Sequence, residues 1–370
     1  MNVYDKMLET INTRNLFSEE SALLLMVSGG SDSTALARLC ARLREEGKVA
    51  VVDMLHMNHM LRGEDANEDA RFVAKLADEL DIPLFACEMD IASEAARIGD
   101  NIEAVARRER YSAAQEALFS MCQHEGIPVS NAKIATAHTI DDRIENFYMR
   151  SIAGTGPGGF RSMLYSNGAV VRPLLDCTRE DLRRFLIDEA FCGQSSADEC
   201  SVTDGYIEGR TIWREDATNA HTDRFRAYVR HNIVPVAREW NKSLDSTLVR
   251  SMNLIGDEDD MLDDMAFELI AESSEQLGEN PEDGFLLLPS FGKSRIPLAR
   301  RAILKLLKPI LGMDERIDTR SIDAVLDGFE HGLPKSGYVN NIQGNLAVSS
   351  NKLGVRIEPM AAFRKRRKRD

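Results

Sequence analysis

Short apolar segments alternate with stretches of helical periodicity through the first half of the chain. The apolar segments predict buried strands at Ala22–Val27, Val49–Leu55, Pro83–Cys87, Ile134–Ala137 and Ala169–Val171. The periodic stretches predict helices over Thr34–Glu46, Asn67–Leu80, Ile102–Glu125, Asp141–Ile152 and Arg179–Glu189. This alternation predicts an α/β fold with a doubly wound, mostly parallel sheet and helices on both faces. Ligands of such folds bind beyond the carboxyl ends of the strands, so we expect functional residues to follow strands.

The pattern changes in the second half of the chain. The small, acidic and polar stretch Phe191–Gly209 predicts a surface loop or insertion. After about residue 215 the periodicity predicts helices near 224–240, 244–274, 294–311 and 320–330, followed by a short β hairpin near 337–358. We therefore expect a first domain over 1–215, a second, mainly helical domain over 216–345, and a terminal strand with a basic tail over 346–370.

Composition excludes several classes of protein. The chain has no run of 18 apolar residues and its N-terminus lacks a signal-peptide pattern, so we expect a cytoplasmic protein without a membrane span. The six cysteines, at positions 40, 87, 122, 177, 192 and 200, form no CxxC pair. This spacing favours reduced thiols over disulfides or a zinc site.

The formal net charge is −14, which excludes non-specific coating of DNA. The charge is unevenly distributed, however, because six of the last seven residues, Arg364–Asp370, are basic. A local basic surface leaves docking of a specific RNA open. The tail itself is compatible either with phosphate contacts or with a solvated, untethered end.

The sharpest motif is Ser28-Gly29-Gly30-Ser31-Asp32-Ser33, directly after a predicted strand and before a predicted helix. Glycines allow the backbone to approach an anion closely, and the N–H groups at a helix N-terminus favour phosphate. An acidic residue in such a loop, Asp32, would repel phosphate unless Mg²⁺ lay between them, which predicts a metal-bound polyphosphate. The alternative is a plain strand–helix turn. A Walker A loop is excluded, since GxxxxGK[ST] is absent.

The SGGSDS loop resembles the PP-loop of the N-type ATP pyrophosphatases, which cleave ATP between its α and β phosphates. Further motifs follow in order: HMNHMLRG at 56–63, NIEAVARRERY at 101–111, ATAH at 135–138, DDRIE at 141–145, GTG at 154–156, RPLL at 172–175, DATN at 216–219 and RHNIVP at 230–235. Together they resemble the tRNA(Ile)-lysidine synthetase family over roughly residues 20–240. The resemblance implies a Rossmann-like PP-loop ATPase fold and a second domain that contacts tRNA.

The resemblance also implies an activity. This family uses ATP to activate the C2 carbonyl of the wobble cytidine in the CAU-anticodon isoleucine tRNA, and the ε-amino group of L-lysine then displaces AMP to form lysidine. The expected ligands are therefore ATP, Mg²⁺, L-lysine and tRNA(Ile) with a CAU anticodon, in a carbon–nitrogen ligase that releases AMP and pyrophosphate. A homodimer is compatible with the sequence, which does not determine the oligomeric state.

The resemblance implies catalytic roles for Asp32, Asp142, Glu145 and Arg230, and a tentative Mg²⁺ ligand in Asp32. It implies ATP binding by Ser28, Gly29, Gly30, Ser31, Asp32 and Ser33, and substrate binding by Arg107, Arg110, His138 and Arg226. Two positions depart from the family pattern: Asn146 stands where Thr is usual, and Ala227 stands where Asn is frequent.

The acidic residues suit the second half of such a reaction. Lysine must lose a proton from an amine with a pKa near 10.4 before it can attack, and carboxylates can bind the ammonium and accept that proton. Asp142 and Glu145 lie three positions apart, and Asp141 and Glu145 four, so all can share one helix face. The alternative is that the aspartates cap the helix with Thr139.

Other candidates also have plainer interpretations. His138 is equally compatible with a structural role, Arg107 and Arg110 with solvated helix positions, and His56 and His59 with polar walls of the site. The sequence Gly154–Gly159 matches GxGxxG but follows a helix and precedes no clear one, so a dinucleotide site is not expected.

Three rival functions remain. A PP-loop tRNA thiolase would need sulfur-handling cysteines, and the dispersed cysteines disfavour it. Amide-forming PP-loop enzymes that use small acids are disfavoured by the arginine-bearing helical region. A catalytically inert RNA-binding protein would have no use for the acidic residues Asp32, Asp142 and Glu145.

Overall fold

The computed structural model describes residues 1–191, 205–207, 210–214, 225–312, 315–332 and 337–368. The chain divides into two compact units, Met1–Leu254 and Ile255–Asp370. Each unit has its own apolar core. None of the described helices combines the length and the apolar content needed to cross a membrane.

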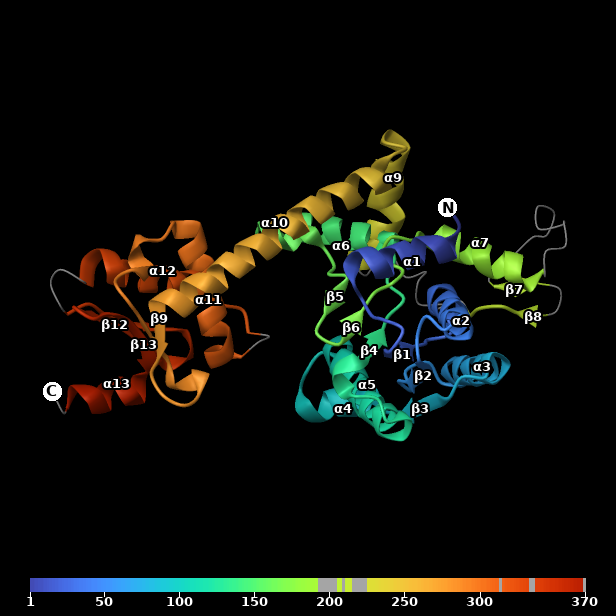
Figure 1. Ribbon diagram of the computed structural model, residues 1–370, viewed down its shortest axis with the longest axis horizontal. Coiled ribbons are helices and arrows are strands. Elements are labelled where there is room, and N and C mark those ends of the chain that lie inside the picture. The colour runs from blue at the N-terminus through green and yellow to red at the C-terminus, as the bar shows by residue number, and fades with distance from the viewer. Residues whose placement is uncertain (192–204, 208–209, 215–224, 313–314, 333–336, 369–370) are drawn as a thin grey trace. The chain divides into compact units, whose positions relative to one another are not determined.

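The first unit is built on a six-stranded sheet (Figure 1). Its strands are β1 (Ala22–Met26), β2 (Val51–Asn58), β3 (Leu84–Glu88), β4 (Ala132–Ala135), β5 (Ser166–Asn167) and β6 (Val170–Val171). They lie in the order β3-β2-β1-β4-β6-β5, and all neighbours are parallel except β5 and β6. This pairing confirms the predicted α/β fold with a mostly parallel sheet. Parallel strands need crossover connections, and the helices between the strands provide them.

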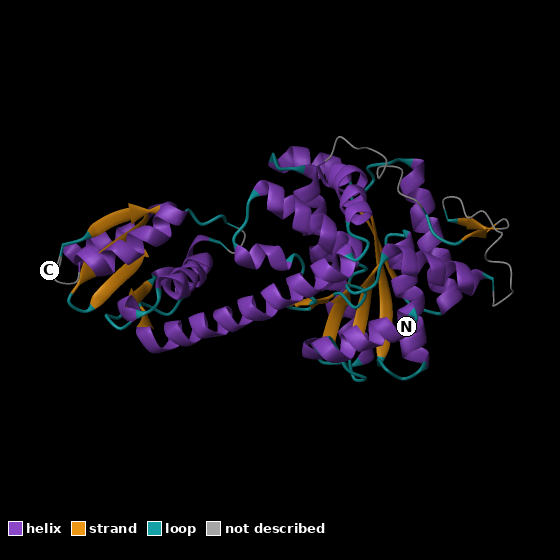
Figure 2. Ribbon diagram, turned by 90° about the horizontal axis from the view of Figure 1, so that it is seen from above, coloured by secondary structure: helices purple, strands orange, loops and turns teal. Residues whose placement is uncertain are grey.

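Helices cover both faces of this sheet (Figure 2). The helices of the first 190 residues are α1 (Val3–Arg14), α2 (Ser31–Glu45), α3 (Glu64–Leu80), α4 (Ile91–Ile98), α5 (Ile102–Glu125), α6 (Ile140–Ala153) and α7 (Arg179–Ala190). One core joins α1, α2, α3 and α7 to the sheet, and a second core joins α5 to β1, β2 and β4. The sequence pattern did not predict α1 or α4.

A helical segment follows, and it packs onto α6. It comprises α8 (Phe225–Tyr228), a π-helical turn (Val229–Ile233), α9 (Val234–Trp240) and α10 (Leu244–Ser273), preceded by the short strands β7 (Tyr206–Ile207) and β8 (Arg210–Thr211). Ile140 and Ile144 of α6 form an apolar cluster with Val229 and Val234. This packing keeps residues 225–254 in the first unit, so the compact unit extends beyond the boundary predicted near residue 215.

The second unit contains an antiparallel sheet as well as helices. Its strands are β9 (Ser274–Gln276), β10 (Phe285–Leu287), β11 (Val339–Ile342), β12 (Leu346–Asn351) and β13 (Gly354–Pro359), in the order β11-β12-β13-β10-β9. Its helices after α10 are α11 (Ile296–Leu311), α12 (Thr319–Asp327) and α13 (Met360–Arg367). Phe285, Ile303, Val325 and Ile357 meet in its core.

The predicted hairpin near 337–358 exists, and it forms part of a five-stranded sheet within the mainly helical second unit. One expectation for this region needs correction. The segment 346–370 is not a separate terminal piece, because β12 and β13 are central in that sheet and the basic tail is helical through Arg367. Strands β9 and β10 are only three residues long, too short for a clear alternating pattern.

Candidate active site

The Gly–Ser loop lies between β1 and α2. Gly29 has φ +92°, a conformation that favours glycine, and a Cβ there would lie 3.4 Å from Cδ1 of Phe72. Helix α2 begins at Ser31, earlier than the predicted start at Thr34. Ser31, Asp32 and Ser33 therefore occupy its first turn, where the backbone N–H groups lack intrahelical partners and favour an anion.

Side chains hold this loop in shape. The Ser33 hydroxyl accepts from the Ser28 backbone N–H at 3.2 Å and donates to the Gly30 carbonyl at 3.1 Å. Thr34 Oγ1 donates to the Gly29 carbonyl at 3.3 Å, and the Arg214 backbone N–H donates to the same carbonyl at 2.8 Å. The loop is thus preorganised by its own hydroxyls, and the structure brings all six predicted nucleotide residues together.

Helix α6 supplies the second group of predicted residues. It follows β4, the neighbour of β1, and presents Asp142 and Glu145, which are both buried. Asp142 Oδ2 accepts from the backbone N–H and the hydroxyl of Thr139, at 2.9 and 3.1 Å. Asp142 therefore closes the capping box and still has Oδ1 available for other partners. The capping alternative holds for Asp142, but capping does not exhaust its interactions.

Two predicted arginines pair with these carboxylates. Arg226 of α8 donates from Nη2 to Asp142 Oδ1 at 2.7 Å and from Nε to Glu145 Oε2 at 2.8 Å. Arg230, in the π-helical turn, donates from Nε to Glu145 Oε1 at 2.6 Å. Such charge-assisted pairs are strong and directional. The structure therefore joins Arg226, Arg230, Asp142 and Glu145 in one cluster.

Arg179 also belongs to the cluster, and the sequence analysis missed it. Its Nε donates to Asp32 Oδ2 at 3.1 Å, while its Nη2 lies 3.5 Å from Asp142 Oδ1 and its Nη1 lies 4.0 Å from Glu145 Oε1. Its backbone N–H donates to Asp141 Oδ2 at 2.8 Å. Its position offered a signal: Arg179 is the first residue of the helix after β6, so it follows a strand at the same edge of the sheet.

Arg238 is a second residue that the sequence analysis missed. Its Nη2 donates to Asp141 Oδ1 at 2.8 Å and its Nε donates to Asp245 Oδ1 at 2.9 Å. Asp141 thus accepts hydrogen bonds from Arg238 and from the backbone N–H of Arg179, whereas Asp142 and Glu145 accept from Arg226.

Burial and charge shift the pKa values of these groups. For Asp142, burial raises the pKa, but Arg226 and Arg179 outweigh it and the net pKa lies below the usual range. For Asp32, burial raises the pKa, Arg179 opposes the shift and the nearby charge of Asp142 adds to it. Burial lowers the pKa of His138 to about 4, so its imidazole is neutral at pH 7.

The remaining predicted residues lie on α5 and after β4. His138 Nδ1 is 2.9 Å from Thr136 Oγ1, and both Asp142 and Arg226 influence its charge, so it borders the cluster. Arg107 lies over the Tyr111 ring at 5.1 Å, and Arg110 contacts His59 Nε2 at 3.0 Å. The exposed α5 arginines are thus separate from the ion pairs of Asp142 and Glu145. The motif at 216–219 lies outside the described residues. So does most of the polar stretch 191–209, of which only residues 191 and 205–207 are described.

The donor groups fit a magnesium ion that arrives with phosphates. No cluster of three or more His, Cys, Asp or Glu side chains suited to a metal occurs in the described part of the chain. Mg²⁺ is usually held by one or two carboxylates together with substrate phosphates, and keeps several waters. Asp32, in the first turn of α2, can supply one such carboxylate.

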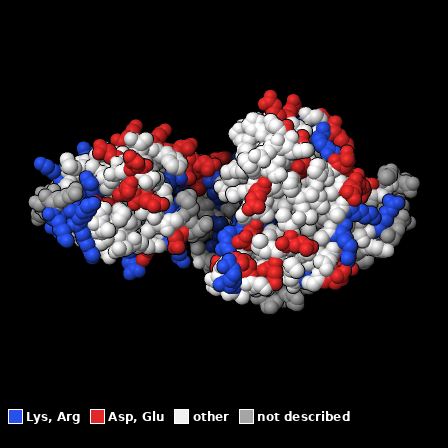
Figure 3. Space-filling model, turned by 90° about the horizontal axis from the view of Figure 1, so that it is seen from below, with Lys and Arg blue, Asp and Glu red and all other residues white. Residues whose placement is uncertain are grey.

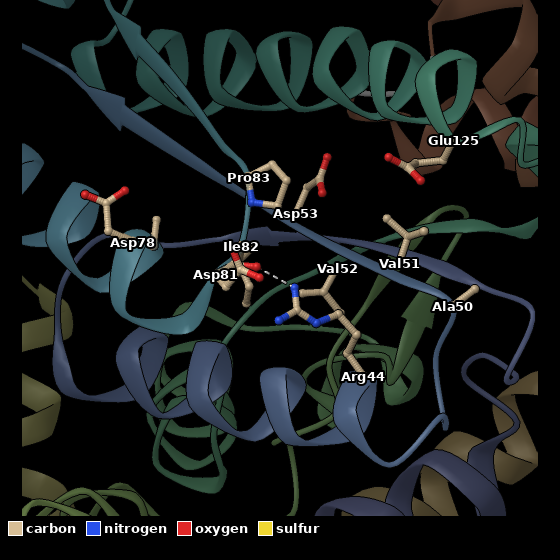
Figure 4. A pocket seen from close by; sticks show the side chains of 11 residues that line it. Arg44, Ala50, Val51, Val52, Asp53, Asp78, Asp81, Ile82, Pro83 and Glu125 are labelled. Carbon is tan, nitrogen blue, oxygen red and sulfur yellow. Dashed lines mark hydrogen bonds between the residues drawn. The ribbon is translucent and has the colours of Figure 1, made fainter.

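A cavity of about 590 Å³ lies elsewhere in the first unit (Figure 4). It is lined by Asp53, Arg44, Asp81 and Glu125, among others, near the amino end of β2. Since ligands of parallel sheets bind at the carboxyl ends, this cavity is separate from the predicted site, and none of the predicted site residues lines it.

Comparison with known proteins agrees with this geometry. A family model described as the PP-loop domain matches residues 2–192, which is more than half of the chain. The chain belongs to the PP-loop family. The matched PP-loop region contains the loop at 28–33, the acidic residues of α6 and Arg179, but it ends before Arg226 and Arg230.

Curated relatives of this PP-loop protein have a consistent name. The tRNA(Ile)-lysidine synthase of Porphyromonas gingivalis W83 is 35% identical over 244 residues, which cover 65% of this chain and 46% of that protein. The tRNA(Ile)-lysidine synthase of Caldanaerobacter subterraneus is 27% identical over 324 residues, which cover 87% of this chain and 62% of that protein. The chain thus spans about half to three-fifths of the length of the curated relatives it matches. A solved U34-tRNA thiolase from Methanococcus maripaludis aligns at 14% identity over 69% of this chain and 78% of that chain, with a TM-score of 0.45.

Proposed function

We propose that the protein is an ATP-dependent ligase that forms lysidine at the wobble cytidine of the CAU-anticodon isoleucine tRNA. The C2 carbonyl oxygen of the cytidine attacks the α-phosphorus of ATP and releases pyrophosphate, and the ε-amino group of L-lysine then attacks C2 and releases AMP. One observation carries the proposal: the guanidinium of Arg179 lies within 4.0 Å of the PP-loop acid Asp32 and of both α6 acids, Asp142 and Glu145. The names of the curated relatives support the same reaction.

The first half of the reaction belongs to the loop at 28–33. Its N–H groups and hydroxyls would bind the pyrophosphate end of ATP, where the helix N-terminus favours negative charge. A Mg²⁺ ion held partly by Asp32 would neutralise the phosphate charge as the cytidine oxygen attacks the α-phosphorus.

The second half belongs to Asp142 and Glu145. Their carboxylates would bind the lysine ammonium in exchange for Arg226 and Arg230, which occupy them in this structure. The lowered pKa of Asp142 makes it a weak proton acceptor, so we assign it to binding the ammonium rather than to removing its proton. His138, neutral at pH 7, borders the same place and can accept a hydrogen bond.

The partners follow from this chemistry. Arg107 and Arg110 are exposed on α5 and would contact the tRNA rather than lysine. L-lysine and tRNA(Ile) are the proposed substrates. We also propose a cytoplasmic location and a homodimeric assembly.

The thiolase alternative receives no support from the described cysteines. Burial raises the pKa of Cys40 and of Cys177 to about 12, so neither is a thiolate at neutral pH. Cys87 and Cys122 are likewise free thiols on separate elements.

The deciding experiment offers labelled lysine, ATP and Mg²⁺ to the purified protein with two transcripts, the CAU isoleucine tRNA and the methionine tRNA. Label is expected only in the isoleucine transcript, with one AMP released for each lysine attached. Asp142→Asn is expected to raise the KM for lysine about 100-fold, because it removes a charge-assisted contact. Glu64→Gln, an exposed carboxylate on α3, is the matched control and should leave KM unchanged. AMP release that does not depend on lysine would reject the proposal.

A further inference from the structure

Arg179 is placed between two sets of acids that serve different steps. On one side its Nε contacts Asp32 at 3.1 Å, and on the other its Nη atoms lie 3.5 Å from Asp142 and 4.0 Å from Glu145. Arg226 contacts both acids of the second set, and Arg230 contacts Glu145. Arg179 contacts acids of both sets.

The backbone of Arg179 is fixed while its side chain has a choice of partners. It is the first residue of α7, held by the Thr178 capping box, and its N–H donates to Asp141 at 2.8 Å. The side chain is mostly but not fully buried, with 22% of its surface exposed, so it can turn without a change of the helix. An arginine has several donors in a planar fork and can exchange one oxyanion for another.

We propose that Arg179 is a positioning residue that couples the nucleotide half of the site to the lysine half. In this structure it holds Asp32. With magnesium and ATP bound, Asp32 would hold the metal and the Arg179 guanidinium would turn toward the phosphates. Asp142 and Glu145 then lose part of their compensating charge and attract the lysine ammonium more strongly.

This coupling rests on the function proposed above, and it gives a physical reason for an order of events. Lysine would bind weakly to the empty protein, because its ammonium must compete with three guanidinium groups. Nucleotide binding removes one of the three competitors. By reciprocity, bound lysine must tighten nucleotide binding by the same factor by which nucleotide tightens lysine binding.

A double-mutant cycle on nucleotide binding tests the coupling without requiring lysidine formation. The Kd of ATP with Mg²⁺ is measured by calorimetry for the wild type, Glu145→Gln, Arg179→Ala and the double variant. Glu145→Gln removes one of the acids that hold Arg179 and so frees its guanidinium for the phosphates. We therefore expect Glu145→Gln to tighten ATP binding about tenfold more in the wild-type background than in the Arg179→Ala background. Additive effects of the two substitutions would overturn the proposal.

Two further variants separate coupling from folding. If Arg179→Ala is unstable, Arg179→Lys replaces it in the cycle. The lysine keeps the charge but not the planar fork, so this variant should retain part of the coupling. Arg184→Ala changes an exposed arginine on the same helix and should behave as the wild type. A wild-type protein that shows the coupling but attaches no lysine would contradict the proposed function and leave the coupling standing. A protein that does not bind ATP would contradict both.

Discussion

Asp142 shows how one carboxylate serves two purposes. One oxygen accepts two hydrogen bonds from Thr139 and so fixes the start of α6, while the other accepts from Arg226. The cap determines the orientation of the carboxylate before any ligand arrives, since both Thr139 donors lie on the same turn. Preorganisation of this kind reduces what must be ordered when a ligand binds.

Gly29 is the residue whose backbone shapes the phosphate loop. Gly29→Ala is expected to destabilise the protein by about 1–2 kcal/mol, because L-residues strain at positive φ and the added methyl group contacts Phe72. It should also weaken ATP binding, since the loop must shift to relieve the backbone strain at φ +92°. Chemical denaturation and ATP titration measure the two effects.

Gly47 is the matched control for this substitution. It has φ +69°, and a Cβ there would meet nothing within 4 Å. Gly47→Ala should cost a similar amount of stability through backbone strain and leave ATP binding unchanged. Equal loss of ATP binding in both variants would contradict a specific role for the loop.

Asp53 is buried in the cavity near the amino end of β2, and burial raises its pKa to about 6, with a smaller contribution from Glu125. The folded state therefore holds this proton more tightly than the unfolded chain, so stability falls as pH rises from about 4 to 6. Asp53→Asn is expected to raise the free energy of unfolding by on the order of 1 kcal/mol at pH 7, and by much less at pH 4. Denaturant unfolding at the two pH values measures this, and an equal gain at both would contradict it.

The elements that position the site were predictable from the sequence. Their strands are short apolar segments and their helices have a clear helical period. The sequence predicted β1, β2, β4 and α6 within a few residues of their observed bounds, and hence the edge where the site lies. The start of α2 was placed too late, because its first turn is polar and its apolar stripe begins only afterwards.

The ion pairs of the site could be predicted only in part. The family resemblance indicated Asp142, Glu145, Arg226 and Arg230, and the spacing of the two acids on one helix face agreed with it. Their pairing with each other is a tertiary contact across more than eighty residues, which no local pattern encodes. Arg179 was missed for the same reason: its partner Asp32 is distant in sequence.

The turn that carries Arg226 and Arg230 depends on an apolar cluster with α6. Val229 is fully buried there, against Ile140, Ile144 and Val234. Val229→Ala is expected to destabilise the protein by about 1–2 kcal/mol, through the loss of two buried methyl groups, and to lower the rate of lysidine formation because both arginines move with the turn. Val236→Ala, at a position that is 64% exposed, is the control. Unchanged activity at reduced stability would show that the arginines are held by their ion pairs alone.

At the scale of the whole molecule, the uneven charge has a structural location. The exposed residues Arg364, Lys365 and Arg367 lie on α13, and exposed Lys368 is its C-cap. Figure 3 shows basic side chains gathered at the end of the second unit that carries the C-terminus. Phe363 is buried beneath them, and Arg366 pairs with the buried Glu358. The helix is therefore anchored through its inner face, and the alternative of an untethered tail does not hold for the described residues.

This basic surface gives a prediction for tRNA binding. Replacing its four exposed residues with Gln is expected to reduce the slope of log affinity against log salt by about 1–3, since each lost phosphate contact removes released counterions. The matched control replaces four other exposed basic residues of the second unit, Lys293, Arg295, Arg300 and Arg320. An equal change in both variants would indicate a general charge effect rather than a contact.

The ion pairs of the active site also bear on how this protein can change over generations. Asp32, Asp141, Asp142 and Glu145 are matched by Arg179, Arg238, Arg226 and Arg230, so the formal charges cancel. Loss of an arginine leaves a largely buried carboxylate uncompensated, which costs more than loss of a whole pair. Natural variants should consequently alter these positions two at a time, and a lineage that has lost one acid should have lost its arginine too.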